Sequence, residues 1–146
     1  MSSVIGIEYC KVDLQGRFKL PVGLKKQLAL GDDMRFVLRC SIYNRCLELF
    51  TYQSFQEEVA RLSEKLNLYD PEGKRLFRRM TQSNLVELDT FDRFLLPKEQ
   101  RKSVNIDKDI VIVSSATCME IWDAATYKAI DNDGFDYVAA ASKLLA

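Results

Sequence analysis

Histidine is absent from this sequence of 146 residues. The absence excludes a Ser-His-Asp triad, a Cys-His catalytic pair, a metal site with imidazole ligands and a histidine pH switch. Long apolar runs are also absent, since none approaches the roughly 20 residues of a transmembrane helix. The first ten residues lack the basic and apolar regions of a secretory signal peptide. We therefore expect a cytoplasmic protein without membrane contact.

The cysteines follow no common metal-binding pattern. The four cysteines are Cys10, Cys40, Cys46 and Cys118, and no two of them form a CxxC motif. Reduced, buried thiols are typical of an intracellular protein. A zinc site built from cysteine alone is the alternative, with a spacing that resembles no known pattern. We predict neither a metal nor a cofactor.

Net charge is absent as well, because 21 basic side chains balance 21 acidic ones. A neutral total gives no attraction of the whole molecule to nucleic acid. The distribution is uneven, however. Residues 1–80 hold 14 basic and 10 acidic side chains, whereas residues 81–146 hold 7 and 11. Residues 11–26 carry a net charge of +4, and the equivalent window 87–102 carries none. A phosphate backbone would select the first window.

An internal repeat relates residues that are 76 positions apart. The segment Asp13-Leu-Gln-Gly-Arg-Phe-Lys-Leu-Pro21 aligns with Asp89-Thr-Phe-Asp-Arg-Phe-Leu-Leu-Pro97. After a four-residue insertion in the first copy, Cys46-Leu-Glu-Leu-Phe50 aligns with Cys118-Met-Glu-Ile-Trp122. An ordered set of matches of this length indicates a duplicated unit.

Each copy is predicted to have the order β-β-α-β-β. In the first copy we expect a strand over 4–12 and a turn in which Gly16 takes a positive φ while Asp13 accepts hydrogen bonds from amides. A strand over 17–20 would return along the first, and Pro21 would begin a helix over 22–28. Strands over 34–40 and 46–50 complete the copy. In the second copy Asp92 replaces Gly16, and aspartate tolerates the left-handed conformation.

Helices are predicted between and after the copies. The pattern Ser54-x-x-Glu57 is a capping box, so we expect a helix to begin at Ser54. A second helix over about 72–82 carries Arg75, Arg78 and Arg79, which could bind DNA or form ion pairs between subunits. A third helix is expected near residue 124, and the tail over 135–146 is a further candidate.

These residues resemble the MraZ family of bacterial transcriptional regulators. The signature is Asp13-x-x-Gly-Arg17 with Pro21, repeated as Asp89-x-x-x-Arg93 with Pro97. The resemblance implies an α+β fold of tandem AbrB-like, double-split β-α-β repeats, a swapped-hairpin barrel with flanking helices. The expected units are 4–51 (repeat 1), 52–83 (helical connector), 84–123 (repeat 2) and 124–146 (helical tail). Asp92 and the pair Ser114-Ser115 depart from the glycines that the family prefers.

The resemblance also implies a function without catalysis. Members form ring-shaped homo-oligomers, here an expected octamer or dodecamer. They bind double-stranded DNA at tandem direct repeats in the promoter of the division and cell-wall gene cluster, usually as repressors. The corresponding expected localisation is the cytoplasm, in association with the nucleoid. The alternatives are an oligomeric scaffold for other proteins and an antitoxin-like AbrB-fold protein, whereas no set of residues supports an enzyme.

The first hairpin is the expected DNA contact, because its side chains can follow phosphates or enter the major groove as a β-ribbon. Asp13, Gly16 and Asp89 are expected to shape the turns. For Arg17 and Arg93 the alternative role is an ion pair across each turn, and for the lysines it is a solvated surface. The predicted DNA-binding residues are Lys11, Gln15, Arg17, Lys19, Lys25, Lys26 and Arg93.

Overall fold

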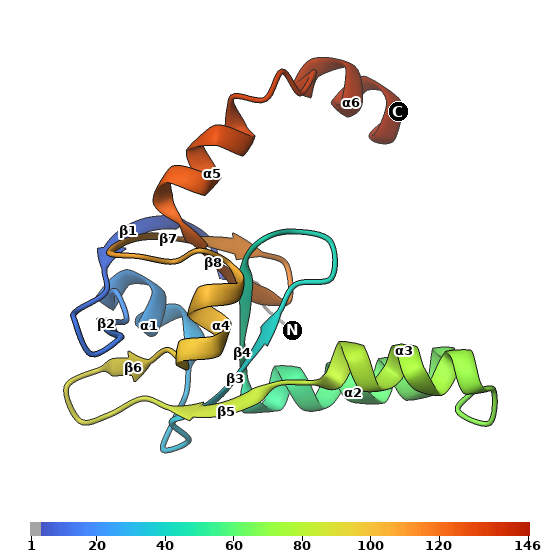
Figure 1. Ribbon diagram of the computed structural model, residues 1–146, viewed down its shortest axis with the longest axis horizontal. Coiled ribbons are helices and arrows are strands. Elements are labelled where there is room, and N and C mark those ends of the chain that lie inside the picture. The colour runs from blue at the N-terminus through green and yellow to red at the C-terminus, as the bar shows by residue number, and fades with distance from the viewer. Residues whose placement is uncertain (1–3) are drawn as a thin grey trace.

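Two antiparallel sheets form the centre of the computed structural model, which describes residues 4–146 (Figure 1). The strands are β1 (Ile7–Lys11), β2 (Arg17–Lys19), β3 (Arg35–Cys40), β4 (Leu47–Thr51), β5 (Asn84–Glu87), β6 (Arg93–Leu95), β7 (Asp109–Ser115) and β8 (Cys118–Asp123). The helices are α1 (Val22–Leu28), α2 (Tyr52–Lys65), α3 (Pro71–Thr81), α4 (Lys98–Ser103), α5 (Ala124–Asp131) and α6 (Tyr137–Leu144). The predicted α+β class is confirmed, and the paired strands are antiparallel.

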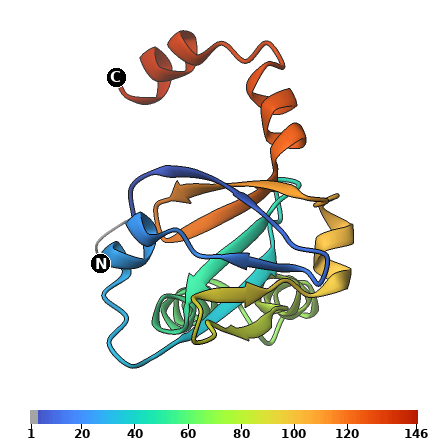
Figure 2. The ribbon, with the colours of Figure 1, turned by 90° about the vertical axis from the view of Figure 1, so that its left-hand side faces the viewer.

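The two copies of the repeat exchange strands. The six-stranded sheet has the order β1-β7-β8-β4-β3-β5, so the first strand of each copy pairs with the third strand of the other. Strands β4 and β8 join the copies at the middle of this sheet. The second strands, β2 and β6, form a separate two-stranded ribbon, seen face-on in Figure 2.

The expectation that residues 17–20 pair with residues 4–12 is wrong. Strand β2 pairs with β6 instead, with Phe18 opposite Phe94. Both phenylalanine side chains are buried, and their ring centroids lie 5.5 Å apart. Burying two adjacent aromatic rings in one core stabilises this pairing between copies.

The main core lies between the large sheet and the ribbon. Phe94 of the ribbon meets Phe36 of β3 edge to face, with ring centroids 4.7 Å apart. Strand β7 is buried on both faces, as its apolar run predicts: Ile110 and Ile112 enter this core, while Val111 packs with Trp122 under α5. A third cluster of Val37, Phe50 and Phe55 lies under α2.

Local capping sets where the helices begin. Pro21 precedes α1, whose bounds are those that the sequence predicts. The expected start of α2 at Ser54 is wrong, because the Thr51 hydroxyl accepts the amide of Ser54 and the helix begins at Tyr52. Strand β4 therefore passes into α2 without a loop. In α3, the Asp70 carboxylate accepts the amide of Gly73.

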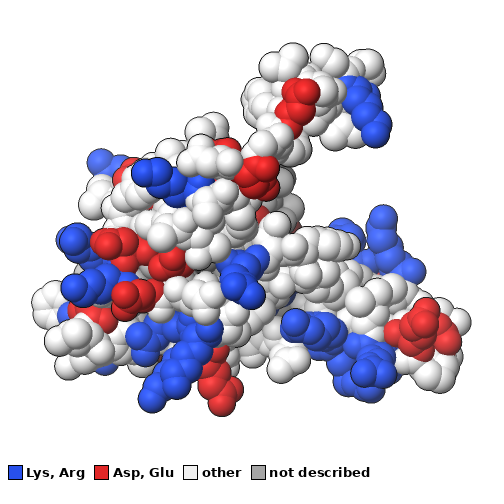
Figure 3. Space-filling view, turned by 45° about the horizontal axis from the view of Figure 1, so that its top comes forward, with Lys and Arg blue, Asp and Glu red and all other residues white. Residues whose placement is uncertain are grey.

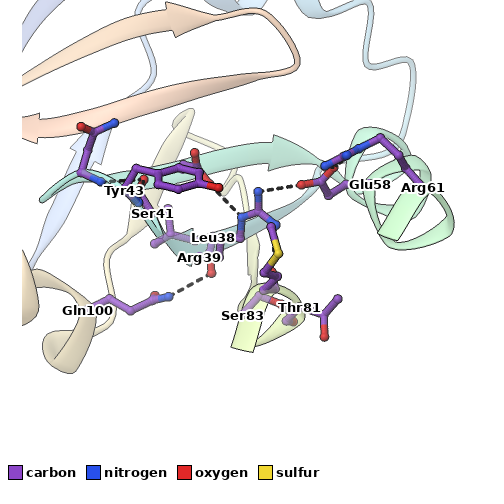
Figure 4. Close-up of polar contacts among 12 residues, drawn as sticks. Leu38, Arg39, Ser41, Tyr43, Glu58, Arg61, Thr81, Ser83 and Gln100 are labelled. Carbon is purple, nitrogen blue, oxygen red and sulfur yellow. Dashed lines mark hydrogen bonds and ion pairs between the residues drawn. The ribbon is translucent and has the colours of Figure 1, made fainter. Parts of the chain in front are cut away.

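A buried arginine links α2 and α3 to the sheet through hydrogen bonds. Arg39 of β3 is only 8% exposed and donates to Glu48 of β4 at 2.8 Å and to Glu58 of α2 at 2.7 Å. Its third bond reaches the main-chain carbonyl of Met80 in α3 at 2.8 Å. Figure 4 shows Arg39 directed toward Glu58 of α2. Burial raises the pKa of Glu58, but the hydrogen bonds from Arg61 and Arg39 outweigh it and hold that pKa below its ordinary value.

Two parts of the chain extend away from the sheets. Helices α2 and α3 form a hairpin on one side, which we call the arm, while α5 and α6 leave the sheet in another direction as the tail (Figure 1). Among residues 4–146, no helix has the length and apolar character needed to cross a membrane.

Candidate nucleic-acid interface

An aspartate side chain organises the turn that precedes each ribbon strand. Asp13 Oδ1 accepts the amides of Gln15 at 2.9 Å and Arg17 at 2.8 Å. Gly16 has a φ of +91°, as predicted. The amide bond from Arg17 is the main reason why the pKa of Asp13 lies below its ordinary value, with a smaller opposing effect of desolvation. The turn is therefore fixed before any ligand binds.

The second turn repeats this geometry with different residues. Asp89 Oδ1 accepts the amides of Phe91 at 2.8 Å and Arg93 at 2.9 Å, and the latter bond is the first cause of its lowered pKa. Asp92 takes a φ of +61°, so aspartate does occupy the left-handed conformation that Gly16 occupies in the first turn. Asp13 and Asp89 thus each accept two amides of their own turn, and Gly16 lies in the first turn with a positive φ.

The ribbon turns one face to the core and the other to solvent. Because strand side chains alternate, Phe18 and Phe94 point inward and their neighbours point outward. The register places Lys19 opposite Arg93 and Arg17 opposite Leu95. We call the outward set, Arg17, Lys19, Arg93 and Leu95, the ribbon face. Both turns extend from this ribbon, at opposite ends of its antiparallel ladder.

The two arginines of the ribbon face differ in their partners. Arg93 Nε lies 3.2 Å from Asp89 Oδ2, and its guanidinium lies 5.2 Å from the centre of the Phe91 ring. Arg17 forms no ion pair in the described chain; its Nη1 donates to Gln15 Oε1 at 2.7 Å. Within the described residues Arg17 therefore has no carboxylate at ion-pair distance, although the nearby Asp13 carboxylate still attracts it, whereas Arg93 has one.

The two helices beside the turns repeat this difference. Lys25 of α1 forms an ion pair with Asp92 of the second turn, with a distance of 2.7 Å between Nζ and Oδ1. The equivalent Arg101 of α4 lies over Gly16 of the first turn, where an added Cβ would be 2.8 Å from its Cζ. Each helix thus supports the turn of the other copy. The first turn keeps a basic neighbour without an acidic partner, and the second does not.

The remaining predicted residues lie around this ribbon. Lys19 is exposed and forms no ion pair within residues 4–146. Lys11 of β1 is 3.7 Å from Asp109, with both side chains exposed, so screening by water leaves this pair weak. Lys26 lies exposed in the last turn of α1, where a cation also suits the helix dipole. In Figure 3 basic and acidic side chains intermingle at this end of the molecule.

The turns also expose apolar side chains that the sequence did not predict as part of the site. Leu14 is 99% exposed, Phe91 70% and Leu95 48%. The repeat alignment carries a signal for one of them, since it places Phe91 opposite Gln15. An aromatic residue opposite an amide, together with Asp92 opposite Gly16, marks the two turns as unequal.

The thiols of Cys46 and Cys118 are held in their protonated form. Burial, with a smaller contribution from Glu48 and Glu120, raises the pKa of Cys118 to about 12, and burial also raises the pKa of Cys46. Metals and nucleophilic chemistry need the thiolate. In the part of the chain that the structure describes, no three ligand side chains are placed to hold a metal ion.

Comparison with known proteins finds relatives along nearly the whole chain. The family model described as "MraZ protein, putative antitoxin-like" matches residues 80–141. The transcriptional regulator MraZ of Flavobacterium psychrophilum is 34% identical over 99% of this chain and 93% of its own length. The chain belongs to the MraZ family. A Christiangramia forsetii regulator of the same name is 35% identical over 93% of this chain and 88% of its own length.

An MraZ relative from a different bacterium matches most of the chain as well. The transcriptional regulator MraZ of Treponema pallidum is 32% identical over 81% of this chain and 77% of its own length. The family resemblance that the two Asp-to-Arg turns indicate is therefore confirmed. All three relatives carry the name of transcriptional regulators and not of enzymes.

Proposed function

We propose that this MraZ family protein is a transcriptional regulator that binds double-stranded DNA through the first turn and the ribbon face. The observation that carries the proposal is Arg17, which forms no ion pair within residues 4–146 and lies beside Lys19 on the outer face of the two-stranded ribbon. A ribbon of this width fits the major groove, and positive side chains at its edge bind phosphates. The names of the relatives support the regulatory role.

Within this proposal the seven predicted residues contribute unequally. Arg17, Lys19 and Gln15 form the primary contact, because the bond from Arg17 to Gln15 holds both side chains in place. Lys11 and Lys26 extend the positive surface. Lys25 and Arg93 contribute less, since each already has a carboxylate partner.

We further propose that the protein is a repressor that acts as a ring. Residues 4–51 and 84–123 would be the AbrB-like repeats of a swapped-hairpin barrel, joined by the connector 52–83 and followed by the tail 124–146. A ring of eight or twelve copies would set one ribbon on each of several direct repeats ahead of the division and cell-wall genes, and so exclude polymerase on the nucleoid. Several weak contacts along one DNA raise the affinity through effective concentration.

A mobility-shift titration on the DNA upstream of the chain's own gene tests the DNA contact. The wild-type protein should shift this DNA, with an affinity that falls steeply with salt. Arg17→Ala should abolish the shift at moderate salt and reduce the salt slope by about 1. Arg45→Ala is the matched control, because Arg45 is exposed in the β3–β4 loop, away from the turns (Figure 1).

Two results would contradict the proposal. A folded protein that shifts no DNA at low salt does not have this function. A shift that Arg17→Ala leaves unchanged places the contact elsewhere. A salt-insensitive complex with another protein would favour the scaffold or antitoxin-like alternative, because phosphate binding must weaken as salt rises.

A further inference from the structure

The arm carries a basic surface that the proposed DNA contact does not use. No residue of α3 is buried, and Arg75, Arg78 and Arg79 share one side of the helix at spacings of three and four. Within residues 4–146 none of them forms an ion pair. Leu76 lies among them and is 42% exposed. These four residues form what we call the arm face; basic side chains gather along the arm in Figure 3.

The tail has the opposite charge and is equally uncovered. Asp131, Asp133 and Asp136 lie within six residues that contain no basic side chain. None of the three forms an ion pair in the described chain. Phe135 is 66% exposed and Val138 73%, and neither α5 nor α6 has a buried residue. We call residues 131–138 the tail segment.

We propose that the tail segment of one copy binds the arm face of a second copy. The three aspartates would meet the three arginines, and Phe135 and Val138 would cover the apolar surface at Leu76. Exposed apolar groups next to unpaired charges of complementary sign are the features of an interaction surface. The inference rests on the self-association proposed above and does not depend on DNA binding.

The placement of the two surfaces favours contact between copies. The arm and the tail leave the sheets in different directions, so the tail segment lies away from the arm of its own chain (Figure 1). Two different surfaces of one chain that bind each other make a head-to-tail contact. Such a contact repeats from copy to copy and closes into a ring when the rotation between copies allows it.

A charge-exchange experiment on the full-length protein, without DNA, tests the proposal. One variant reverses the arm face (Arg75→Glu, Arg78→Glu), and the other reverses the tail segment (Asp131→Lys, Asp133→Lys). Asp136 is left intact because it caps α6. The control variant reverses two exposed lysines elsewhere (Lys98→Glu, Lys108→Glu). Circular dichroism verifies folding, and sedimentation velocity gives the mass of the assembly against protein and salt concentration.

The wild type should form an assembly whose mass decreases as salt rises. Each reversed variant alone should need about ten-fold more protein to assemble, or more, because attraction becomes repulsion. An equimolar mixture of the two reversed variants should regain the assembly, and the control should match the wild type.

Other outcomes overturn the contact. A monomeric wild type, reversed variants that assemble as the wild type does, or a mixture that fails to recover would each show that the two surfaces do not meet. A concentration-independent contact within one chain would overturn it as well. If the arm variant keeps the wild-type mass and, in a separate mobility-shift titration, loses DNA affinity, the arm face binds phosphate and not the tail segment.

Discussion

The ion pair between Lys25 and Asp92 makes a direct prediction about the inequality of the two turns. Replacing Asp92 by asparagine removes the carboxylate 2.7 Å from Lys25 while keeping the size of the side chain. Asparagine accepts the left-handed conformation that residue 92 adopts, so the turn remains intact. The substitution therefore releases one cation beside the ribbon and leaves the fold in place.

The structure gives the size of both effects. The two side chains are 34% and 31% exposed, and a pair with this much solvent contributes at most about 1 kcal/mol to the free energy of unfolding. Stability should therefore change little. One additional phosphate contact per bound subunit should steepen the slope of log affinity against log salt by about 0.9, with tighter binding at low salt.

Mobility-shift titrations at several salt concentrations measure this slope. Glu64→Gln is the matched control, since it removes the same charge from an exposed residue of α2, on the arm and away from the ribbon. If Asp92→Asn and Glu64→Gln have equal slopes, Lys25 does not face the DNA. If Asp92→Asn lowers the free energy of unfolding by several kcal/mol, the pair is a major source of stability, and the small contribution expected from its exposure is refuted.

Three further predictions concern stability. Arg39→Ala should lower the free energy of unfolding in urea by about 3–5 kcal/mol, because it leaves the largely buried Glu48 carboxylate without its ion pair and Glu58 with Arg61 alone. Arg35→Ala, which breaks an exposed pair on the same strand, should cost about 1 kcal/mol or less; equal losses would contradict the role of burial. Gly16→Ala should lower the free energy of unfolding by about 1–2 kcal/mol because of the positive φ of Gly16. The loss should exceed that of Gly31→Ala, because an added Cβ at Gly31 meets no atom within 4 Å, whereas one at Gly16 meets Arg101. Equal losses would show that the Arg101 side chain moves aside at no cost. The turn carboxylate of Asp13 has a lowered pKa, so its contribution to stability is present above the ordinary aspartate pKa of about 3.9 and disappears as the pH falls through the folded-state value; NMR titration of its carboxyl carbon should give a midpoint below the ordinary value, and a midpoint at or above it would refute the turn geometry.

The sequence by itself determined the local structure of each copy. Helix α1 begins after Pro21 because proline suits a helix start, and the first turn forms because Gly16 accepts a positive φ and Asp13 binds nearby amides. The apolar run of β7 predicted a strand buried on both faces. These features depend on residues within a few positions of one another, so a linear pattern contains them.

Only the tertiary structure decided which strands pair and which charges remain free. A pattern of alternating residues predicts that β2 is a strand. Its partner strand lies 76 residues away and is selected by the shared burial of Phe18 and Phe94. The same exchange brings Lys25 to Asp92 across 67 positions. Because charge neutralisation depends on distance in space, the net charge of +4 in residues 11–26 could not show which of its side chains has a partner.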